Sequence, residues 1–313
     1  MLIINLLFFL ISCLVLAISG HFIVKSLVKI VQYYELKEFL TGFIIIAIAT
    51  SIPDLFVGVS SALNQIPSLS LGNIIGSNII KLTLIVGVAA LLGKRIKFEK
   101  EIEKKDIIYT SVIAILPIIL FLDHELSRID GIVLLIIFSL YVFRLITRSG
   151  HFKKVSNGVA RKEVPINVIN FIISLIILLI SAYFVVEYSS LLITDLALPP
   201  ILIGLVIISL GTSLPELSFE IYSVLKGFSG MALGNLLGSV VVNSTLVLGI
   251  TSIILPIKAY FPSFIIGTLF LVINLILFII FAKTKKEISW KEGIILIMLY
   301  VIFTISSFLA RGY

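Results

Sequence analysis

Long apolar stretches separated by short polar segments run along the whole chain. Most approach or exceed the roughly 20 residues that a helix needs to cross a bilayer. None shows the strict alternation of a membrane strand, and backbone groups in lipid must be hydrogen-bonded within their own segment. The pattern predicts ten transmembrane helices, at residues 3–32, 38–62, 69–92, 107–122, 129–147, 165–193, 199–225, 231–255, 261–282 and 289–310.

The composition agrees with a chain that lies in lipid along its whole length. Hydrophobic residues make up 59% of the chain and charged residues 13%, against about 25% charged residues in a soluble domain. The first apolar stretch has no basic residue before it and runs past the length of a signal-peptide core, so we expect it in the mature protein. The sequence therefore predicts an all-α integral membrane protein whose main surroundings are the lipid bilayer.

The basic residues are distributed unequally between the loops on the two sides of the predicted membrane protein. Of the 24 Lys and Arg residues, 20 lie in or next to the loops that follow the odd-numbered predicted spans. Three lie on the opposite side of the membrane (Arg128, Lys258 and Arg311), and Lys81 lies within a span. This bias predicts a multi-pass protein of the cell membrane with both termini extracellular.

Several classes of partner are not expected. The net charge of +7 does not form one basic face, so no nucleic acid is predicted as a partner. The chain has no phosphate-binding Gly-x-x-x-x-Gly-Lys-Ser/Thr loop, so no nucleotide is predicted either. We expect a monomer without a cofactor, whose ligands are inorganic cations.

One run of polar and small residues occurs twice in the same register. Residues 49–54 (Ala-Thr-Ser-Ile-Pro-Asp) return 162 residues later as 211–216 (Gly-Thr-Ser-Leu-Pro-Glu), and residues 72–77 (Gly-Asn-Ile-Ile-Gly-Ser) return as 234–239 (Gly-Asn-Leu-Leu-Gly-Ser). Matched Thr, Ser, Pro, Asn and Gly residues indicate an internal duplication. Five spans per copy is an odd number, so the copies should be inverted relative to each other. We predict a first repeat at 1–147, a cytoplasmic connector at 148–164 and a second repeat at 165–313.

Each copy carries a carboxylate inside an apolar span, Asp54 in the first and Glu216 in the second. An ionisable group at membrane depth is costly, and it indicates a functional site. A proline directly precedes each carboxylate, and proline removes a backbone hydrogen bond and exposes carbonyl oxygens. Carbonyl, hydroxyl and carboxylate oxygens are the donors that alkali and alkaline-earth cations prefer. Thr50 and Thr212 stand four residues before the carboxylates, on the same helix face.

Two polar stripes follow from the second motif. Asn73, Ser77 and Lys81 are spaced by four residues in the third span, and Asn235, Ser239 and Asn243 repeat that spacing in the eighth. The glycines of the same motif form a Gly-x-x-x-Gly pattern, which is typical of close helix packing in membranes. We expect the stripes to face the two carboxylate-bearing spans.

These motifs resemble the cation/calcium exchanger superfamily, and in particular its prokaryotic sodium/calcium exchanger branch. The resemblance implies a secondary antiporter rather than an enzyme, exchanging sodium for calcium by alternating access at a mid-membrane site formed by spans two, three, seven and eight. Spans one and six are then expected to slide across that site. The candidate cation-binding residues are Ala47, Thr50, Ser51, Asp54, Asn73, Ser77, Ser209, Thr212, Ser213, Glu216, Asn235, Ser239 and Asn243, with Asp54, Glu216, Thr50 and Thr212 as the expected metal ligands and Lys81 as a modulator.

The chain departs from the family pattern at its centre. It has Asp54 where the family has glutamate, and Lys81 where the family has asparagine or aspartate. An ammonium about 4 Å from a carboxylate contributes about 4 kcal/mol at an effective dielectric constant near 20, and it would repel a cation similarly. With Asp54, Glu216 and Lys81 counted, the formal charge of the site is minus one. Lys81 either replaces one sodium ion or titrates and couples transport to protons; alternatively, its long side chain reaches toward a membrane surface.

Two other functions stay open at this point. A cation/proton antiporter, moving calcium or sodium against protons, is one of them. The other is a degenerate exchanger that binds ions without transporting them.

Overall fold

The computed structural model describes residues 2–33, 46–97, 104–148, 163–225, 227–259, 261–284 and 287–309. The predicted connector lies mostly outside these residues. The α-helices are α1 (Leu2–Tyr33), α3 (Ala47–Thr50), α4 (Ile52–Leu63), α5 (Ser68–Ile80), α6 (Val86–Gly93), α7 (Lys104–Leu120), α8 (Arg128–Arg148), α9 (Val164–Leu196), α10 (Pro200–Ile203), α11 (Ser209–Thr212), α12 (Leu214–Leu225), α13 (Ser229–Val242), α14 (Leu248–Ile254), α15 (Phe261–Thr284) and α16 (Trp290–Leu309).

Within the described ranges, π-helical segments interrupt the long helices at η2 (Lys81–Ile85), η6 (Gly204–Ile208) and η7 (Asn243–Val247). A short 3-10 turn, η3 (Phe121–Asp123), follows α7. Each π-helical segment continues the preceding α-helix, so α5, η2 and α6 form one long apolar rod, as do α13, η7 and α14.

The prediction of a helical membrane protein is confirmed. Within the described ranges, eight helical segments are long and apolar enough to cross a bilayer, and a ninth is obtained when the bent pair 200–212 and 214–225 counts as one span. The predicted span at 38–62 begins outside the described residues, and its described part consists of α3 and α4. The predicted number of ten spans therefore stays a prediction.

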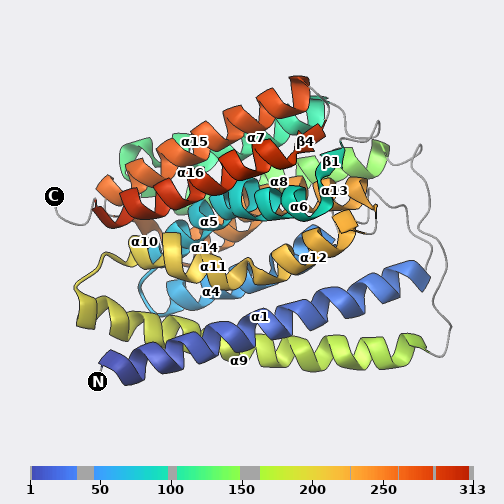
Figure 1. Cartoon of the computed structure of the whole chain (residues 1–313). Helices are drawn as coiled ribbons and strands as arrows, with labels where there is room; N and C mark the ends of the chain where they lie inside the picture. Colours follow the sequence, from blue (N-terminus) through green and yellow to red (C-terminus); the bar gives the residue numbers. More distant parts are fainter. Residues whose placement is uncertain are drawn as a thin grey trace.

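The bounds of the elements repeat along the chain. Helix α12 begins and ends 162 residues after α4, and η7 lies 162 residues after η2. Helices α1 and α9 have the same relation at their starts, and they pack against each other along their length. Figure 1 shows these two helices side by side and running in opposite directions.

Two short antiparallel ribbons join the halves of the chain. Strand β1 (Arg95–Lys97) pairs with β4 (Glu287–Ser289), and β2 (Glu125–Leu126) pairs with β3 (Ile257–Lys258). In each ribbon, one strand comes from the first half of the sequence and one from the second. The ribbons therefore connect the helices of the two halves through backbone hydrogen bonds.

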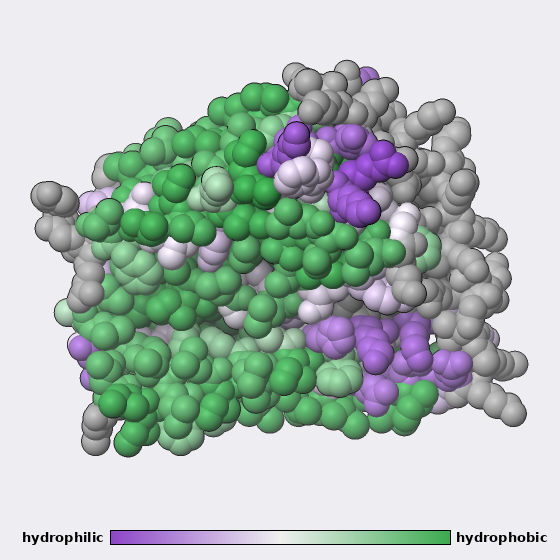
Figure 2. Space-filling model, viewed as in Figure 1, coloured by the Kyte–Doolittle hydropathy of each residue, from purple (hydrophilic) through white to green (hydrophobic). Residues whose placement is uncertain are grey.

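The centre of the molecule is formed by the two long rods. In the most apolar 18-residue stretch of each span, 83% of the residues are buried for 68–93 and 78% for 229–254, whereas the share is between 17% and 39% for the other six unbent spans. Hydrophobic side chains cover most of the outer face in Figure 2, and hydrophilic ones gather toward one end. This distribution is expected for helices that surround a central pair and face lipid on the outside.

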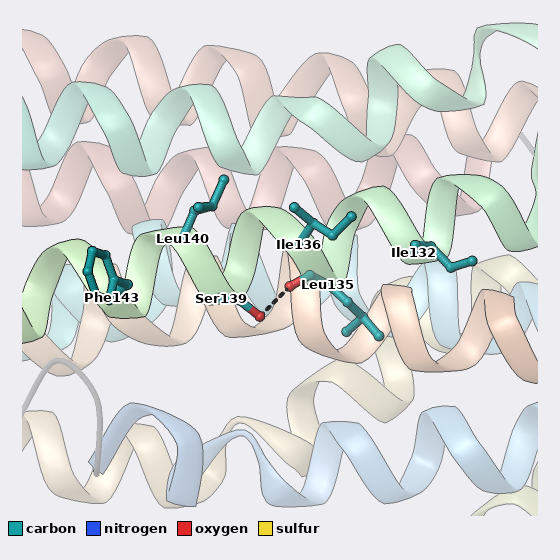
Figure 3. Close-up of a pocket in the computed structure, with 6 residues that line it drawn as sticks. All are labelled: Ile132, Leu135, Ile136, Ser139, Leu140 and Phe143. Atoms are coloured by element: carbon teal, nitrogen blue, oxygen red, sulfur yellow. Dashed lines mark hydrogen bonds between the residues drawn. The ribbon is translucent and has the colours of Figure 1, made fainter.

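A shallow hollow on the outer surface lies along α8. Figure 3 shows it lined by Ile132, Leu135, Ile136, Ser139, Leu140 and Phe143. The hydroxyl of Ser139 donates a hydrogen bond to the Leu135 carbonyl oxygen at 2.9 Å, so the serine is satisfied within its own helix. The hollow is apolar and suits contact with lipid chains.

Glycines allow the central rod to touch its neighbour backbone to backbone. A Cβ atom on Gly72 would collide with the backbone of Ile201, and one on Gly76 with the carbonyl oxygen of Leu205. On the other side of this contact, a Cβ atom on Gly204 would collide with the carbonyl oxygen of Leu69. The expectation that the Gly-x-x-x-Gly pattern makes a packing face is confirmed for α5.

This contact predicts that Gly76→Ala destabilises the fold by about 1–3 kcal/mol, because the added methyl group meets backbone atoms that cannot move separately. Thermal unfolding of the purified chain in detergent measures the effect. Gly211→Ala is the matched control, since the nearest atom to its Cβ would be the side chain of Cys13 at 3.3 Å. Equal unfolding temperatures for the two variants would contradict the assigned packing.

Candidate cation-binding site

Two broken helices bring the carboxylates to the centre. The chain leaves α3 and enters α4 at Ser51, and it leaves α11 and enters α12 at Ser213. Asp54 and Glu216 lie in the first turns of α4 and α12, and both are almost fully buried. The amide groups at a helix start carry partial positive charge, which stabilises a carboxylate there.

The polar stripes come from the two central rods, as expected. Asn73 and Ser77 lie on α5, Asn235 and Ser239 on α13, and Lys81 and Asn243 are the first residues of η2 and η7. Single π-helical turns are rare and are frequently found at functional sites. All of the side chains predicted for the site are buried: Ala47, Thr50, Ser51, Asp54, Asn73, Ser77, Lys81, Ser209, Thr212, Ser213, Glu216, Asn235, Ser239 and Asn243.

Both carboxylate oxygens of Asp54 accept hydrogen bonds. Its Oδ1 accepts from Asn73 Nδ2 at 2.8 Å and from Ser77 Oγ at 3.3 Å. Its Oδ2 accepts from Asn243 Nδ2 at 2.8 Å. The carboxylate of the first repeat is thus held by donors from both central rods.

The hydroxyls of the second repeat join this network. Thr212 Oγ1 donates to Asn73 Oδ1 at 3.1 Å, and it also lies 3.3 Å from the carbonyl oxygen of Ser209, one of the two predicted backbone donors. Ser77 Oγ lies 3.3 Å from Thr212 Oγ1 and 3.1 Å from Ser213 Oγ. Six predicted residues are therefore brought together around Asp54, namely Asn73, Ser77, Ser209, Thr212, Ser213 and Asn243.

The corresponding residues of the other half are joined differently. Thr50 Oγ1 donates to Asn235 Oδ1 at 3.1 Å and lies 3.2 Å from the carbonyl oxygen of Ala47, the second predicted backbone donor. Asn235 Nδ2 donates to Glu220 Oε1 at 3.1 Å. The repeat would lead one to expect Glu216 as this acceptor.

Two of the predicted hydroxyls stand apart from the network. Ser239 Oγ donates to the Leu236 carbonyl oxygen of its own helix at 3.1 Å. Ser51 Oγ is buried and has no hydrogen-bond partner among the described residues.

Lys81 lies between the two carboxylates. Its Nζ atom is 3.2 Å from Glu216 Oε1 and 3.6 Å from Asp54 Oδ2, and all three side chains are 0–1% exposed. The alternative in which Lys81 extends toward a membrane surface is therefore wrong. The ammonium occupies the centre of the predicted site, where it competes with a cation for both carboxylates.

Glu220 was missed by the sequence reasoning. It is 5% exposed and lies on α12 one helical turn after Glu216. With Asp54, Glu216 and Glu220 negative and Lys81 positive, the formal charge is minus two rather than the predicted minus one. The available signal was a second acidic residue four positions beyond the motif, at a place where the first repeat has Gly58.

The donor set is made of oxygen atoms. Carboxylates, amide oxygens, hydroxyls and the carbonyls of Ala47 and Ser209 are hard ligands that suit sodium and calcium ions. Within the described ranges, no group of three or more His, Cys, Asp and Glu side chains has the arrangement of a metal centre.

Comparisons with known proteins agree with this chemistry. The family model of the sodium/calcium exchanger proteins matches residues 4–147 and 166–309 of this chain. Sodium/calcium exchanger MaX1 of Methanosarcina acetivorans is 28% identical over 349 aligned residues, which cover 98% of this chain and 99% of the relative. An uncharacterised membrane protein of Methanocaldococcus jannaschii is 28% identical over 302 residues, which cover 96% of this chain and 97% of the relative.

A solved structure is similar over almost the whole chain. It shows the sodium-calcium exchanger NCX_Mj soaked with 10 mM Na+ and zero Ca2+, and it superposes with a TM-score of 0.71 at 27% identity, covering 96% of this chain and 98% of that chain. Fold and site together define a multi-pass membrane transporter of cations rather than an enzyme. The chain belongs to the sodium/calcium exchanger family.

The buried ion pairs predict that Lys81→Met costs about 3–5 kcal/mol in the free energy of unfolding, because two buried carboxylates lose their counter-charge. Unfolding in detergent without added sodium or calcium measures the loss. Lys29→Met is the matched control: its 3.2 Å pair with Glu163 is 40% and 46% exposed, and such pairs contribute at most about 1 kcal/mol. Equal losses would show that the central pair is not a stabilising contact.

Proposed function

We propose that this chain is a secondary active antiporter that exchanges sodium for calcium by alternating access at the central site. Support comes from membership of the sodium/calcium exchanger family, from the exchanger relative MaX1, and from the oxygen donors at the kinks of α4 and α12. The observation that carries the proposal is the buried Lys81 ammonium within 3.2 Å and 3.6 Å of the two carboxylates. The ammonium takes the place of one transported cation.

The architecture proposed with this function is ten spans in two inverted repeats, with 148–164 as the connector and no cofactor. The repeated element bounds and the opposite directions of α1 and α9 support it. The bias of basic residues supports extracellular termini in the cell membrane, and α1 begins at the same end of the bundle at which α16 ends (Figure 1). We propose a monomer as the functional unit.

Helices α1 and α9 form the moving part in this proposal. They pack mainly on each other, and α1 also crosses the kinked helices. At the crossing, a Cβ atom on Gly20 would lie 2.6 Å from the ring of Pro215 and 3.4 Å from the ring of Pro53. Gly20, which has no side chain, therefore packs against the prolines of both kinks. No side chain of α1 projects between the helices at this point, which favours sliding of α1 over the kinks.

The lysine changes the ion balance of the exchange. A fixed ammonium cannot leave with the transported ions, so each cycle carries one positive charge fewer than a site with two carboxylates and no lysine. Near a carboxylate pair it opposes a second cation by about 4 kcal/mol at 4 Å and an effective dielectric constant of 20. We therefore propose fewer sodium ions per calcium ion in this chain.

The decisive experiment is flux into proteoliposomes with sodium, calcium and proton gradients varied independently. The proposal expects radioactive calcium uptake when sodium is high inside and low outside, and little uptake with a proton gradient alone. Uptake driven by protons in the absence of sodium would favour cation/proton antiport. A chain that binds calcium without any flux would be a non-transporting exchanger.

The role of Lys81 has its own test. Lys81→Asn opens a position for one more cation, so the number of sodium ions exchanged per calcium ion should rise by about one. The measured quantity is the reversal sodium gradient of calcium flux at fixed membrane potential. Lys258→Asn is the matched control, because this lysine pairs with Glu125 on the surface and is 74% exposed. An unchanged reversal gradient in Lys81→Asn would remove the lysine from the coupling mechanism.

A further inference from the structure

The two halves of the site differ in how their polar groups are used. One half, the Asp54 half-site, consists of Asp54, Asn73, Ser77, Thr212 and Ser213, and its groups are bonded directly to each other. Its repeat counterpart, the Glu220 half-site, consists of Thr50, Ser51, Glu216, Glu220 and Asn235. Only two side-chain hydrogen bonds join the members of this second half-site.

The difference is clearest in two matched chains of hydrogen bonds. In the Asp54 half-site, Thr212 donates to Asn73, and Asn73 donates to Asp54. In the Glu220 half-site, Thr50 donates to Asn235, and Asn235 donates to Glu220, which is four residues beyond the expected acceptor. Four residues of helix correspond to about 6 Å along the axis. The acceptor of the second chain is therefore displaced by one turn along α12.

This displacement leaves buried oxygens without donors. Neither carboxylate oxygen of Glu216 accepts a hydrogen bond, and its ionic contact is with Lys81. Ser51 Oγ is likewise unpartnered, although its counterpart Ser213 contacts Ser77. Buried polar atoms without partners are rare in folded proteins, and at a site of oxygen donors a bound ion is one way to satisfy them. Three of the unpartnered oxygens at the centre, one of Ser51 and two of Glu216, belong to the Glu220 half-site, and a fourth is Asn243 Oδ1.

The charges point to the same half-site. Lys81 contacts Glu216 at 3.2 Å and Asp54 at 3.6 Å, and Asn243 adds a further donor to Asp54 at 2.8 Å. One ammonium leaves a formal charge of minus two on the three carboxylates, and two of these, Glu216 and Glu220, lie one turn apart on α12. Among the described residues, no ion pair involves Glu220. Two buried carboxylates that share one ammonium and one amide donor form a favourable place for a cation.

We propose that the transported cation binds off-centre, in the Glu220 half-site, with Glu220 as a ligand. The inference rests on the proposed antiport, and it assigns the ion to one half of the doubled site. The carboxylates of Glu216 and Glu220, the hydroxyls of Thr50 and Ser51 and the amide oxygen of Asn235 supply enough oxygens for the about six to eight that calcium takes. In the Asp54 half-site, the polar groups are already occupied by hydrogen bonds to each other and by Lys81, so this half-site does not bind the ion.

Glu220→Gln tests the carboxylate without removing the hydrogen-bond acceptor of Asn235. Calcium and sodium affinity of the purified full-length chain in detergent are measured by isothermal titration and by the rise in unfolding temperature with added chloride salts. The variant should unfold at the wild-type temperature without calcium and bind calcium at least about tenfold more weakly. Glu125→Gln, on the surface ribbon, is the matched control and should bind calcium like the wild type.

A pair of serine variants tests which half-site holds the ion. Ser51→Ala removes a hydroxyl without a hydrogen-bond partner, so the ion-free chain should keep its stability while calcium affinity falls. Ser213→Ala removes a hydroxyl bonded to Ser77, so the ion-free chain should unfold at a lower temperature.

The outcomes distinguish failure of the off-centre site from failure of the proposed antiport. Wild-type calcium affinity in Glu220→Gln, or a weaker affinity in Ser213→Ala than in Ser51→Ala, would overturn the off-centre site while leaving antiport intact. Absence of any sodium or calcium binding to the wild-type chain would overturn the proposed antiport, and with it the site.

Discussion

The structure depends on the burial of one ammonium between two carboxylates at the middle of a membrane protein. Lys81 is fully buried within 3.6 Å of Asp54 and 3.2 Å of Glu216. Each of these charges alone would be prohibitive in this environment, and the three together are tolerated only at close range. The kinks that place the carboxylates and the π-helical segment that begins at Lys81 are the backbone features that make this range attainable.

Much of this arrangement could be predicted from the sequence, because a duplicated motif fixes both composition and register. The burial of Asp54, Asn73 and Thr212 at one centre follows from polar residues repeated at helical spacing within apolar spans. The helical membrane fold follows from the length of the apolar stretches. The number of spans is harder to derive, since the second predicted span begins outside the described residues and the seventh is bent by 44° at Ser213.

The asymmetry of the site could not be predicted in the same way. A repeat leads to the expectation that Asn235 bonds to Glu216 as Asn73 bonds to Asp54. In the structure Glu216 contacts Lys81, and Asn235 turns to Glu220 instead. The hydrogen-bond partner of Asn235 depends on which carboxylate lies within its reach. Side-chain packing decides this over a few ångströms. Sequence spacing specifies the helix face and leaves the partner undetermined.

The two β-ribbons have a mechanical consequence. Because β1 pairs with β4 and β2 with β3, helices α5 to α8 and α13 to α16 are cross-tied at two places by main-chain bonds. No ribbon includes α1 or α9 among the described residues. The ribbons thus tie two groups of helices together, whereas α1 and α9 are held to the rest of the bundle by helix packing. If α1 and α9 slide as proposed, substitutions in the ribbons alter stability, whereas substitutions at the contact over Gly20 alter turnover.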